Sequence, residues 1–521
     1  MKKIFTLFAT VLAFAAVAGA QNVEMNMGQM RKLVMAEGAI NSLYVDEVDE
    51  DKLVEEAIRA MLKELDPHSL YSDAEEVKKM NEPLQGNFEG IGVQFNIAED
   101  TLLVIQTVSG GPSQRVGILA GDRIVTVNDS AIAGVKMERE EIMSRLRGPK
   151  GTEVTLGVLR RGVPELMTFV VTRDKIPVNT LEASYMIAPH IGYIRLGSFG
   201  MTSHDEVATA MDKLLRDGMK DLILDLQDNG GGFLQAAVDI ASEFLDPGQL
   251  IVYTEGRRVP RQDFVASGEG RFRKGRLVVL VNEYSASASE IVSGALQDWD
   301  RAHVIGRRSF GKGLVQRPVS FPDGSMIRLT VAHYYTPSGR CVQKPYGKDT
   351  DYKMDLVNRF NSGELSSADS IHFPDSLRYS TLRLGRTVYG GGGIMPDIFV
   401  PIDTVSYTKY HRELVAKGVV NQANLYFIDH YRKQWEKQYP TFAKFDKKFT
   451  VTDDMLSVVL EKAEAAKIPF DEEQYQASLP LLRTQIKALI ARDLWDMSEY
   501  FHIINTTNES VKAALNYLKN E

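Results

Sequence analysis

Three short segments carry the residue types that could do chemistry. The first is the run Asn229-Gly230-Gly231-Gly232, which lies before a predicted helix that begins at Phe233. Glycines have no Cβ atom, so their backbone N–H groups can point at a ligand, and the N-terminus of the following helix adds partial positive charge. This run is therefore suited to bind an anion or a developing oxyanion.

The second segment is Tyr284-Ser285-Ala286-Ser287-Ala288-Ser289-Glu290, where small residues lead through a turn into a predicted helix. This arrangement suits an exposed nucleophilic hydroxyl beside unbonded N–H groups. Serine at such a place also commonly caps a helix, and here either Ser287 or Ser289 could do so. The segment alone does not distinguish a nucleophile from a cap.

The third segment, Gly306-Arg307-Arg308-Ser309-Phe310-Gly311-Lys312-Gly313, has the glycine and lysine spacing of a phosphate-binding loop. Such a loop needs Ser or Thr after the lysine and a helix beyond it, whereas Gly313 and a predicted hairpin follow here. A lysine buried near a serine has another use, because burial lowers its pKa from about 10.4 toward neutrality. Lys312 could then act as a general base in a Ser-Lys variant of the catalytic triad.

Gln316 follows Lys312 by four residues and could orient its amine. On an extended strand this spacing corresponds to roughly 13 Å, so contact requires a turn around Gly313. Otherwise Gln316 is an ordinary polar residue of a strand, and the pattern leaves both interpretations open.

Length and composition limit the function classes. A chain of 521 residues predicts three or four domains, and 44% hydrophobic with 25% charged residues is typical of folded proteins. The net charge of -8 and the absence of a basic stripe argue against nucleic-acid binding. The single cysteine, Cys341, and nine scattered histidines, among them His68, form no metal motif, so we expect neither a metal nor a cofactor.

The first twenty residues form a segment of their own. Lys2 and Lys3 precede an apolar run over 4–17, and Ala18-Gly19-Ala20 resembles a signal-peptidase site. The run is shorter than the about 20 residues of a membrane span, and no other segment is apolar enough to be one. We therefore expect a signal peptide at 1–20, export, and a periplasmic mature protein.

Periodicity divides the rest of the chain into four parts. Helical spacing covers 21–85, and short β runs separated by glycines cover 86–175. Strands and helices alternate over 176–403, which predicts an α/β core with parallel strands, and 404–521 is helical again. Because parallel strands end at one edge of a sheet, the glycine run and the serine segment should both lie there. The main elements expected are strands at 191–196, 221–226 and 277–281, helices at 233–244 and 289–297, a hairpin at 314–321 and 326–335, and C-terminal helices near 408–417, 424–437, 453–466, 471–495 and 508–518.

Several motifs together resemble those of the carboxy-terminal processing peptidases, also called tail-specific proteases, over nearly all of the mature chain up to about residue 403. The resemblance implies a multidomain α/β protein: an N-terminal helical domain, a PDZ-like β module, a protease core of the ClpP/crotonase type and a C-terminal helical region. It also implies a serine endopeptidase with Ser287 as nucleophile, Lys312 as base and Gln316 holding the lysine. The motifs are Leu65-Asp66-Pro67-His68-Ser69, Gly90-Ile91-Gly92-Val93 with Ala120-Gly121-Asp122-Arg123-Ile124, Asp228-Asn229-Gly230-Gly231-Gly232, Ser285-Ala286-Ser287-Ala288-Ser289-Glu290 and Phe310-Gly311-Lys312-Gly313-Leu314-Val315-Gln316.

The resemblance assigns further roles. The oxyanion donors would be the N–H groups of Ala288 and of one glycine in 230–232; Gly231 is the choice here, although the sequence leaves that glycine open. The PDZ-like module would add an extended peptide as a strand and bind its C-terminal carboxylate near Gly90, Ile91, Gly92 and Val93. The expected partners are proteins or peptides with apolar C-terminal tails, with a second copy of the chain or an adaptor protein left open.

One departure from the family is visible, because the family commonly has arginine where Gln227 stands. Any ion pair of that arginine is therefore in doubt.

Two other functions compete with the peptidase. A catalytically silent PDZ-type scaffold is disfavoured by the intact set of Ser287, Lys312 and Gln316, and a thioester enzyme of the crotonase type is disfavoured by the signal peptide and the peptide-binding module.

Overall fold

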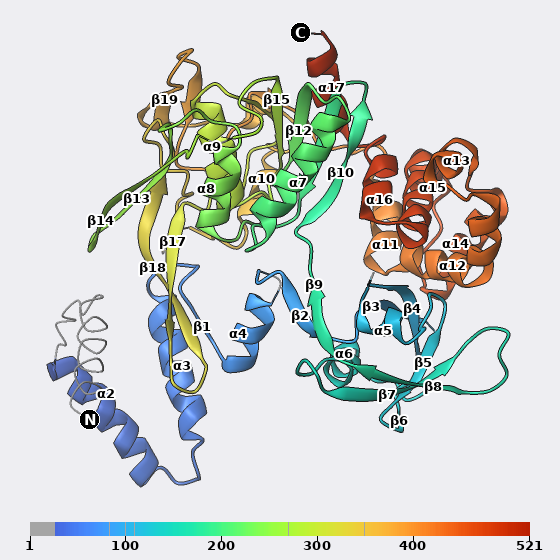
Figure 1. Cartoon of the computed structure of the whole chain (residues 1–521). Coiled ribbons are helices and arrows are strands. Elements are labelled where there is room, and N and C mark those ends of the chain that lie inside the picture. The colour runs from blue at the N-terminus through green and yellow to red at the C-terminus, as the bar shows by residue number, and fades with distance from the viewer. Residues whose placement is uncertain are drawn as a thin grey trace, which may run out of the picture. The chain divides into compact units, whose positions relative to one another are not determined.

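The computed structural model describes residues 27–520 except 83, 99, 109, 269, 348 and 349 (Figure 1). The predicted signal peptide at 1–20 lies outside the described residues. The chain separates between Leu65 and Asp66 into two compact units. No helix in the described ranges is long and apolar enough to cross a membrane.

The first unit contains the helices α2 (Met27–Leu43) and α3 (Glu50–Lys63). The α3 helix begins after Asp49, whose side chain accepts a hydrogen bond of 3.1 Å from the Lys52 N–H. This N-cap satisfies one of the backbone donors that a helix start leaves without a partner.

The β module of the second unit is built on one antiparallel sheet with the order β3-β4-β5-β7-β8 and a short β6 beside β5. The strand β3 lies at the edge of this sheet, where its outer backbone groups can pair with an added strand. A separate pair, β2 with β9, connects the module to the core. The elements are β2 (Asn87–Gly90), β3 (Val93–Ala98), β4 (Thr101–Thr107), α5 (Pro112–Arg115), β5 (Arg123–Val127), β6 (Ser130–Ala131), α6 (Arg139–Leu146), β7 (Glu153–Leu159), β8 (Met167–Thr172) and β9 (Asp174–Pro177).

The core contains a six-stranded sheet with the order β10-β11-β12-β15-β16-β21, parallel from β11 onward. Alternate residues of its buried strands face opposite sides: Leu222 and Leu224 pack with the helices α7 to α9, whereas Ile223 packs with the last helix of the chain. The sheet is therefore covered on both faces. Its elements are β10 (Leu181–Ala188), β11 (Ile191–Leu196), α7 (Ser203–Arg216), β12 (Asp221–Asp225), α8 (Leu234–Ser242), β15 (Leu277–Val281), α9 (Ala288–Asp298), β16 (His303–Gly306) and β21 (Ile398–Phe399).

A second sheet of the core has the order β1-β18-β13-β14, with β17 also paired to β18. Its first strand comes from the segment 66–85, which the sequence pattern groups with the N-terminal helices. The predicted hairpin is present as β17 and β18. The elements are β1 (Leu70–Ser72), α4 (Ala74–Asn81), β13 (Leu250–Gly256), β14 (Val259–Val265), β17 (Leu314–Ser320) and β18 (Met326–Tyr335), followed by α10 (Asp355–Asn361), η1 (Ala368–Ser370), η2 (Asp375–Leu377), β19 (Arg378–Ser380) and β20 (Thr387–Tyr389).

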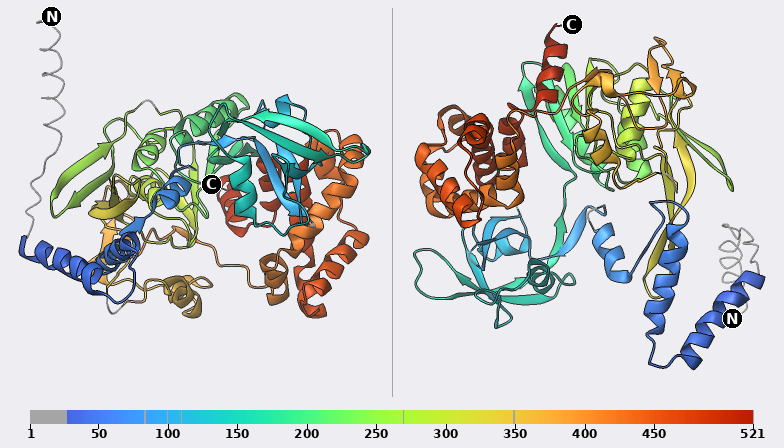
Figure 2. Two further views of the ribbon diagram at one scale, coloured as in Figure 1. Left: turned by 90° about the horizontal axis from the view of Figure 1, so that it is seen from below. Right: turned by 180° about the vertical axis from the view of Figure 1, so that it is seen from behind.

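The C-terminal helices divide into two groups (Figure 2). The helices α11 to α15 share a hydrophobic core of their own. The last helix instead packs on the core sheet through Val511, Ala514 and Leu518. The sequence pattern did not predict the short helices α13 and α16. The elements are α11 (Lys409–Ala416), α12 (Val419–Gln438), α13 (Phe442–Lys448), α14 (Asp453–Ala465), α15 (Glu472–Leu494), α16 (Met497–Ile504) and α17 (Glu509–Asn520).

Candidate active site

The three chemically suggestive segments meet at one end of the core. Ser287, Lys312, Gln316 and the glycines 230–232 line one pocket of about 700 Å³. The glycine run follows β12, and the serine segment follows β15, the neighbouring parallel strand. This is the edge at which ligands of open parallel sheets bind.

The three serines of the second segment have different surroundings. Ser285 and Ser289 are fully buried, and their hydroxyls donate to the carbonyls of Leu226 (2.7 Å) and Asn229 (2.8 Å). Ser287 is half-buried and faces the pocket from the N-terminus of α9, with a φ of 56°. A positive φ at a residue other than glycine is typical of a strained turn at a functional site.

A buried carboxylate joins the turn at 284–290, here called the serine turn, to the segment at 306–313, here called the lysine loop. One oxygen of Glu290 accepts from the N–H groups of Ser287 and Lys312, each at 2.8 Å. Its other oxygen accepts from the Gly311 N–H at 2.7 Å and the Ser309 hydroxyl at 2.5 Å. Burial raises the pKa of Glu290, and these hydrogen bonds oppose that rise. Sequence reasoning gave Glu290 no role of its own, although its spacing of three residues from Ser287 is that of a capping box.

The amine of Lys312 is half-buried and donates to the side-chain oxygen of Gln316 at 3.1 Å. Burial lowers the pKa of Lys312, the nearby Arg328 cation lowers it further, and Glu290 and Asp66 oppose the shift. Within the described chain, no hydrogen bond joins this amine to the Ser287 hydroxyl. The two groups share the pocket, and the lysine favours its neutral form more than an exposed lysine does.

Gln316 contacts Lys312 because the lysine lies outside the strand, which begins at Leu314. The pairing of β17 with β18 also shifts register between Val315 and Gln316. The amide nitrogen of Gln316 donates to the carbonyl of His68. With its nitrogen held in this way, the amide presents its oxygen to the lysine.

The segment Asp66–Ser69 fixes that carbonyl. The Asp66 carboxylate accepts from the N–H groups of His68 (2.8 Å) and Ser69 (2.9 Å), and from the hydroxyls of Ser69 (2.6 Å) and Thr330 (3.1 Å). Burial and the Lys312 charge lower the pKa of His68 to about 4, so its ring is neutral at neutral pH. Sequence reasoning treated the motif only as a family marker, because the motif holds Gln316 through the backbone carbonyl of His68, which side-chain types do not reveal.

The glycine run approaches the serine turn closely. A Cβ atom on Gly231, whose φ is 101°, would lie 2.8 Å from both the Ser287 Cβ and the Ala286 carbonyl oxygen. The Gly231 N–H already donates to the Asn229 side chain at 2.9 Å. The N–H groups of Gly230 and Ala288 have no partner among the residues that the structure describes.

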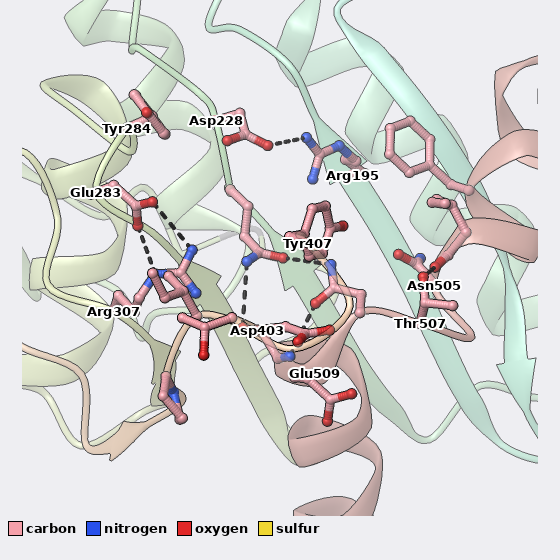
Figure 3. A pocket seen from close by; sticks show the side chains of 18 of the residues that line it. Arg195, Asp228, Glu283, Tyr284, Arg307, Asp403, Tyr407, Asn505, Thr507 and Glu509 are labelled. Atoms are coloured by element: carbon pink, nitrogen blue, oxygen red, sulfur yellow. Dashed lines mark hydrogen bonds and ion pairs between the residues drawn. The ribbon is translucent and has the colours of Figure 1, made fainter. Parts of the chain in front are cut away.

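An arginine from the neighbouring strand pairs with the acid that precedes the glycine run. Arg195 on β11 donates to Asp225 at 2.9 Å. It also donates to Asp228 at 3.1 Å (Figure 3). Gln227 instead accepts from the amide of Asn508 at 3.0 Å. Arg195, Gln227, Asp228 and Asn508 line a second pocket of about 640 Å³, between the loops that carry the glycine and serine segments and the start of α17.

The predicted peptide-binding residues lie apart from the pocket that Ser287 and Lys312 line. Gly90 ends β2, Val93 begins the edge strand β3, and the Ile91 carbonyl accepts from the Ser113 hydroxyl at 2.7 Å. The N–H groups of Ile91 and Gly92 have no acceptor in the described part of the chain. Such a loop can receive a carboxylate on its backbone.

No group of three or more His, Cys, Asp or Glu side chains within the described ranges could hold a metal ion.

Models of four protein families match the chain. The model of peptidase family S41 matches residues 190–354, and that of the PDZ domain matches residues 90–171. The N-terminal domain of the activating protease CtpB matches residues 12–76, and a family of unknown function matches residues 410–496. These matches confirm the predicted multidomain α/β fold class.

Individual proteins are similar over most of the chain. A carboxy-terminal-processing protease of Bartonella bacilliformis is 36% identical over 354 residues, which cover 66% of this chain and 80% of that protein. The carboxy-terminal processing protease CtpA of Bacillus subtilis is 35% identical over 359 residues, which cover 66% of this chain and 76% of that protein. The solved photosystem II D1 C-terminal processing protease is 26% identical, with a TM-score of 0.36 over 71% of this chain and 93% of that chain.

Proposed function

The chain belongs to the carboxy-terminal processing proteases of peptidase family S41, and from this membership we propose that Ser287 is its nucleophile and Lys312 its general base. It is thus a serine-type peptidase with a PDZ domain. One observation carries the assignment: Ser287 faces the pocket that holds Lys312, whose pKa burial lowers and whose amine Gln316 holds.

The reaction follows from these groups. Neutral Lys312 accepts the hydroxyl proton of Ser287 as its oxygen attacks the carbonyl carbon of the scissile peptide bond. The tetrahedral intermediate then collapses, and the lysine ammonium gives its proton to the leaving amine. Water attacks the resulting acyl-enzyme, again losing a proton to Lys312, and this releases the new C-terminus and restores Ser287.

The oxyanion of the intermediate would be stabilised by backbone donors. We assign one donor to the Ala288 N–H at the start of α9, which has no partner in the described structure and carries the positive end of the helix dipole. The second donor would come from the glycines 230–232. Gly231 lies closest to the serine turn, but its N–H must give up its hydrogen bond to the Asn229 side chain before it can donate to the oxyanion. The Gly230 N–H has no such bond to give up in the described part of the chain.

The pocket walls favour apolar substrate side chains. We propose that Gly90, Ile91, Gly92 and Val93 bind a protein's C-terminal tail and that the catalytic pocket accepts an apolar residue beside the cut. The apolar lining is formed by Met80, Leu84, Leu234, Ile291, Leu314 and Met326.

We also propose the domain organisation and location predicted from sequence. A signal peptide at 1–20 would export the protein to the periplasm. An N-terminal helical domain (21–85), the peptide-binding domain (86–175), the peptidase core (176–403) and the C-terminal helical region (404–521) would follow. Self-association or an adaptor protein would act through regions outside the catalytic pocket.

Incubation with an unfolded protein that has an apolar C-terminus tests the assignment, with fragments identified by mass spectrometry. We expect cleavage by the wild type and none by Ser287→Ala. The matched control is Ser366→Ala, which removes an exposed hydroxyl outside the pocket and should cleave like the wild type. Cleavage by Ser287→Ala at the wild-type rate would refute the nucleophile assignment.

A further inference from the structure

Arg328 is a cation of the catalytic pocket that has no acidic partner. It lies on β18 and lines the same pocket as Ser287, Lys312 and Gln316. Its side chain is half-buried, and its Nε is fully buried without a hydrogen-bond partner. No ion pair or hydrogen bond reaches its guanidinium from any residue that the structure describes.

This isolation is unusual for a guanidinium whose Nε is buried, because buried polar and charged groups in proteins are normally paired. Most buried arginines of the described chain pair with an acid, and Arg173, which does not, donates to several backbone carbonyls instead. Arg195 pairs with Asp225 at 2.9 Å, and Arg359 pairs with Glu364 at 2.7 Å. An arginine without an acid in a substrate pocket therefore indicates a ligand that supplies the negative charge.

The charged groups around Arg328 cannot supply that charge. Both oxygens of Glu290 and both oxygens of Asp66 already accept hydrogen bonds from backbone and hydroxyl donors. The ring of His68 is neutral at neutral pH, and Asp355 already pairs with Lys344 at 2.8 Å. Beside the proposed base, the pocket thus holds a guanidinium that no carboxylate of the described chain contacts.

We infer that Arg328 binds a carboxylate of the substrate and so selects the peptides that the enzyme cleaves fastest. The inference rests on the proposed function of the same pocket. A guanidinium binds a carboxylate through two parallel hydrogen bonds, which gives both strength and orientation. Arg328 is opposite Pro318, two residues beyond Gln316 on β17, which places it roughly 7 Å along the strand from the glutamine. The bound carboxylate is therefore close to the scissile bond.

Two substrate groups offer this chemistry: the α-carboxylate of a tail cut near its end, or the side chain of Glu or Asp on the leaving-group side. Two pairs of synthetic peptides with one apolar sequence separate them. The first pair differs by a free or an amidated C-terminus, and the second differs by Glu or Gln near the cut. The pair in which the enzyme prefers the peptide with the carboxylate identifies which carboxylate Arg328 binds.

The variants are Arg328→Gln and a matched control, Arg317→Gln, which removes an exposed charge from the adjacent strand outside the pocket. We expect the wild type and Arg317→Gln to prefer one carboxylate peptide by about tenfold in kcat/KM, the effect of one charge-assisted contact. In Arg328→Gln this ratio should fall close to one. Any contribution of the PDZ domain to binding the α-carboxylate is the same in all three proteins and cancels in the comparison.

The outcomes separate this inference from the function on which it rests. Cleavage by Arg328→Gln with the wild-type ratio for both peptide pairs would overturn the role of Arg328 and leave the peptidase assignment intact. Failure of the wild type to cleave any peptide would overturn both.

A second measurement needs no variant. A carboxylate on Arg328 neutralises the cation that lowers the pKa of Lys312, so that pKa should be higher in the complex than in the free enzyme. For the preferred carboxylate peptide, the acidic limb of kcat should then lie at higher pH than that of kcat/KM. For its neutral counterpart the two limbs should coincide. Coincident limbs for both peptides would contradict the inference.

Discussion

Replacing Glu290 with glutamine should weaken the hydrogen bonds that connect the serine turn with the lysine loop. Four donors share the two carboxylate oxygens of Glu290, and a glutamine offers only one oxygen. Its NH2 group would face two donors, so two charge-assisted hydrogen bonds are lost, each worth about 1.5–3 kcal/mol. Relief of the cost of burying a charge offsets part of this loss. We expect the free energy of unfolding to fall by about 2–4 kcal/mol.

The same substitution should change the pH dependence in a defined direction. Ionised Glu290 raises the pKa of Lys312, so its removal lowers that pKa. Lys312, the proposed base, can accept a proton only when it is neutral, and a lower pKa keeps it neutral at lower pH. The acidic limb of the kcat/KM profile should therefore move to lower pH, while kcat itself falls by about tenfold or more because the serine turn is less well held.

The assay combines denaturant unfolding with kinetics on a peptide of apolar C-terminus across the neutral pH range. The control is Glu243→Gln, a buried carboxylate that pairs with Arg271 and His204 away from the pocket. It should lose stability without moving the acidic limb. The reasoning would be refuted if Glu290→Gln kept the wild-type limb and kcat, or moved the limb to higher pH.

Three further substitutions test other parts of the site. Gly231→Ala should abolish peptidase activity because the new Cβ would lie 2.8 Å from the serine turn, whereas Gly230→Ala, with no atom within 4 Å of its Cβ, should retain its fold by circular dichroism. Gln316→Glu places a negative charge on the lysine amine, so the acidic limb of the pH profile should move to higher pH; an unmoved limb would contradict their contact. Asn508→Ala removes a hydrogen bond to Gln227 and the cap of α17, and should lower stability by about 1 kcal/mol and reduce kcat more than it changes KM. A double-mutant cycle of Asn508→Ala with Gln227→Ala should show coupling, and strict additivity would contradict it.

Much of the core could be predicted from sequence because its signals are local. Apolar runs at 221–226 and 277–281 with glycine or small residues after them predict buried parallel strands that end in ligand-binding turns, and both strands are present as β12 and β15. The short helices α13 and α16 escaped prediction because seven or eight residues contain too few turns to establish a helical period. The packing of α17 on the core sheet also escaped, because an amphipathic pattern shows that a face is buried but not what buries it.

The spacing of the serines shows why site residues are harder to predict than elements. Ser285, Ser287 and Ser289 alternate along one segment, and residue type alone cannot separate them. The structure does so through acceptors far along the chain: the Leu226 and Asn229 carbonyls bind the outer two hydroxyls, and the middle one faces the pocket. Each of these bonds joins residues about sixty positions apart, which no local pattern contains.

The same dependence on distant segments holds for Lys312, the proposed base. Lys312 obtains its orientation from Gln316, which is held by the His68 carbonyl, which is in turn fixed by the Asp66 carboxylate. The loop of Lys312 is joined to Ser287, the proposed nucleophile, through the Glu290 carboxylate and through the Tyr334 hydroxyl, which donates to the carbonyls of both residues. Positions near 66, 290 and 312 must therefore fold together before any one of them has a catalytic geometry. This explains why a substitution outside the proposed reacting pair, such as one at Glu290, should lower kcat while leaving both reacting side chains in place.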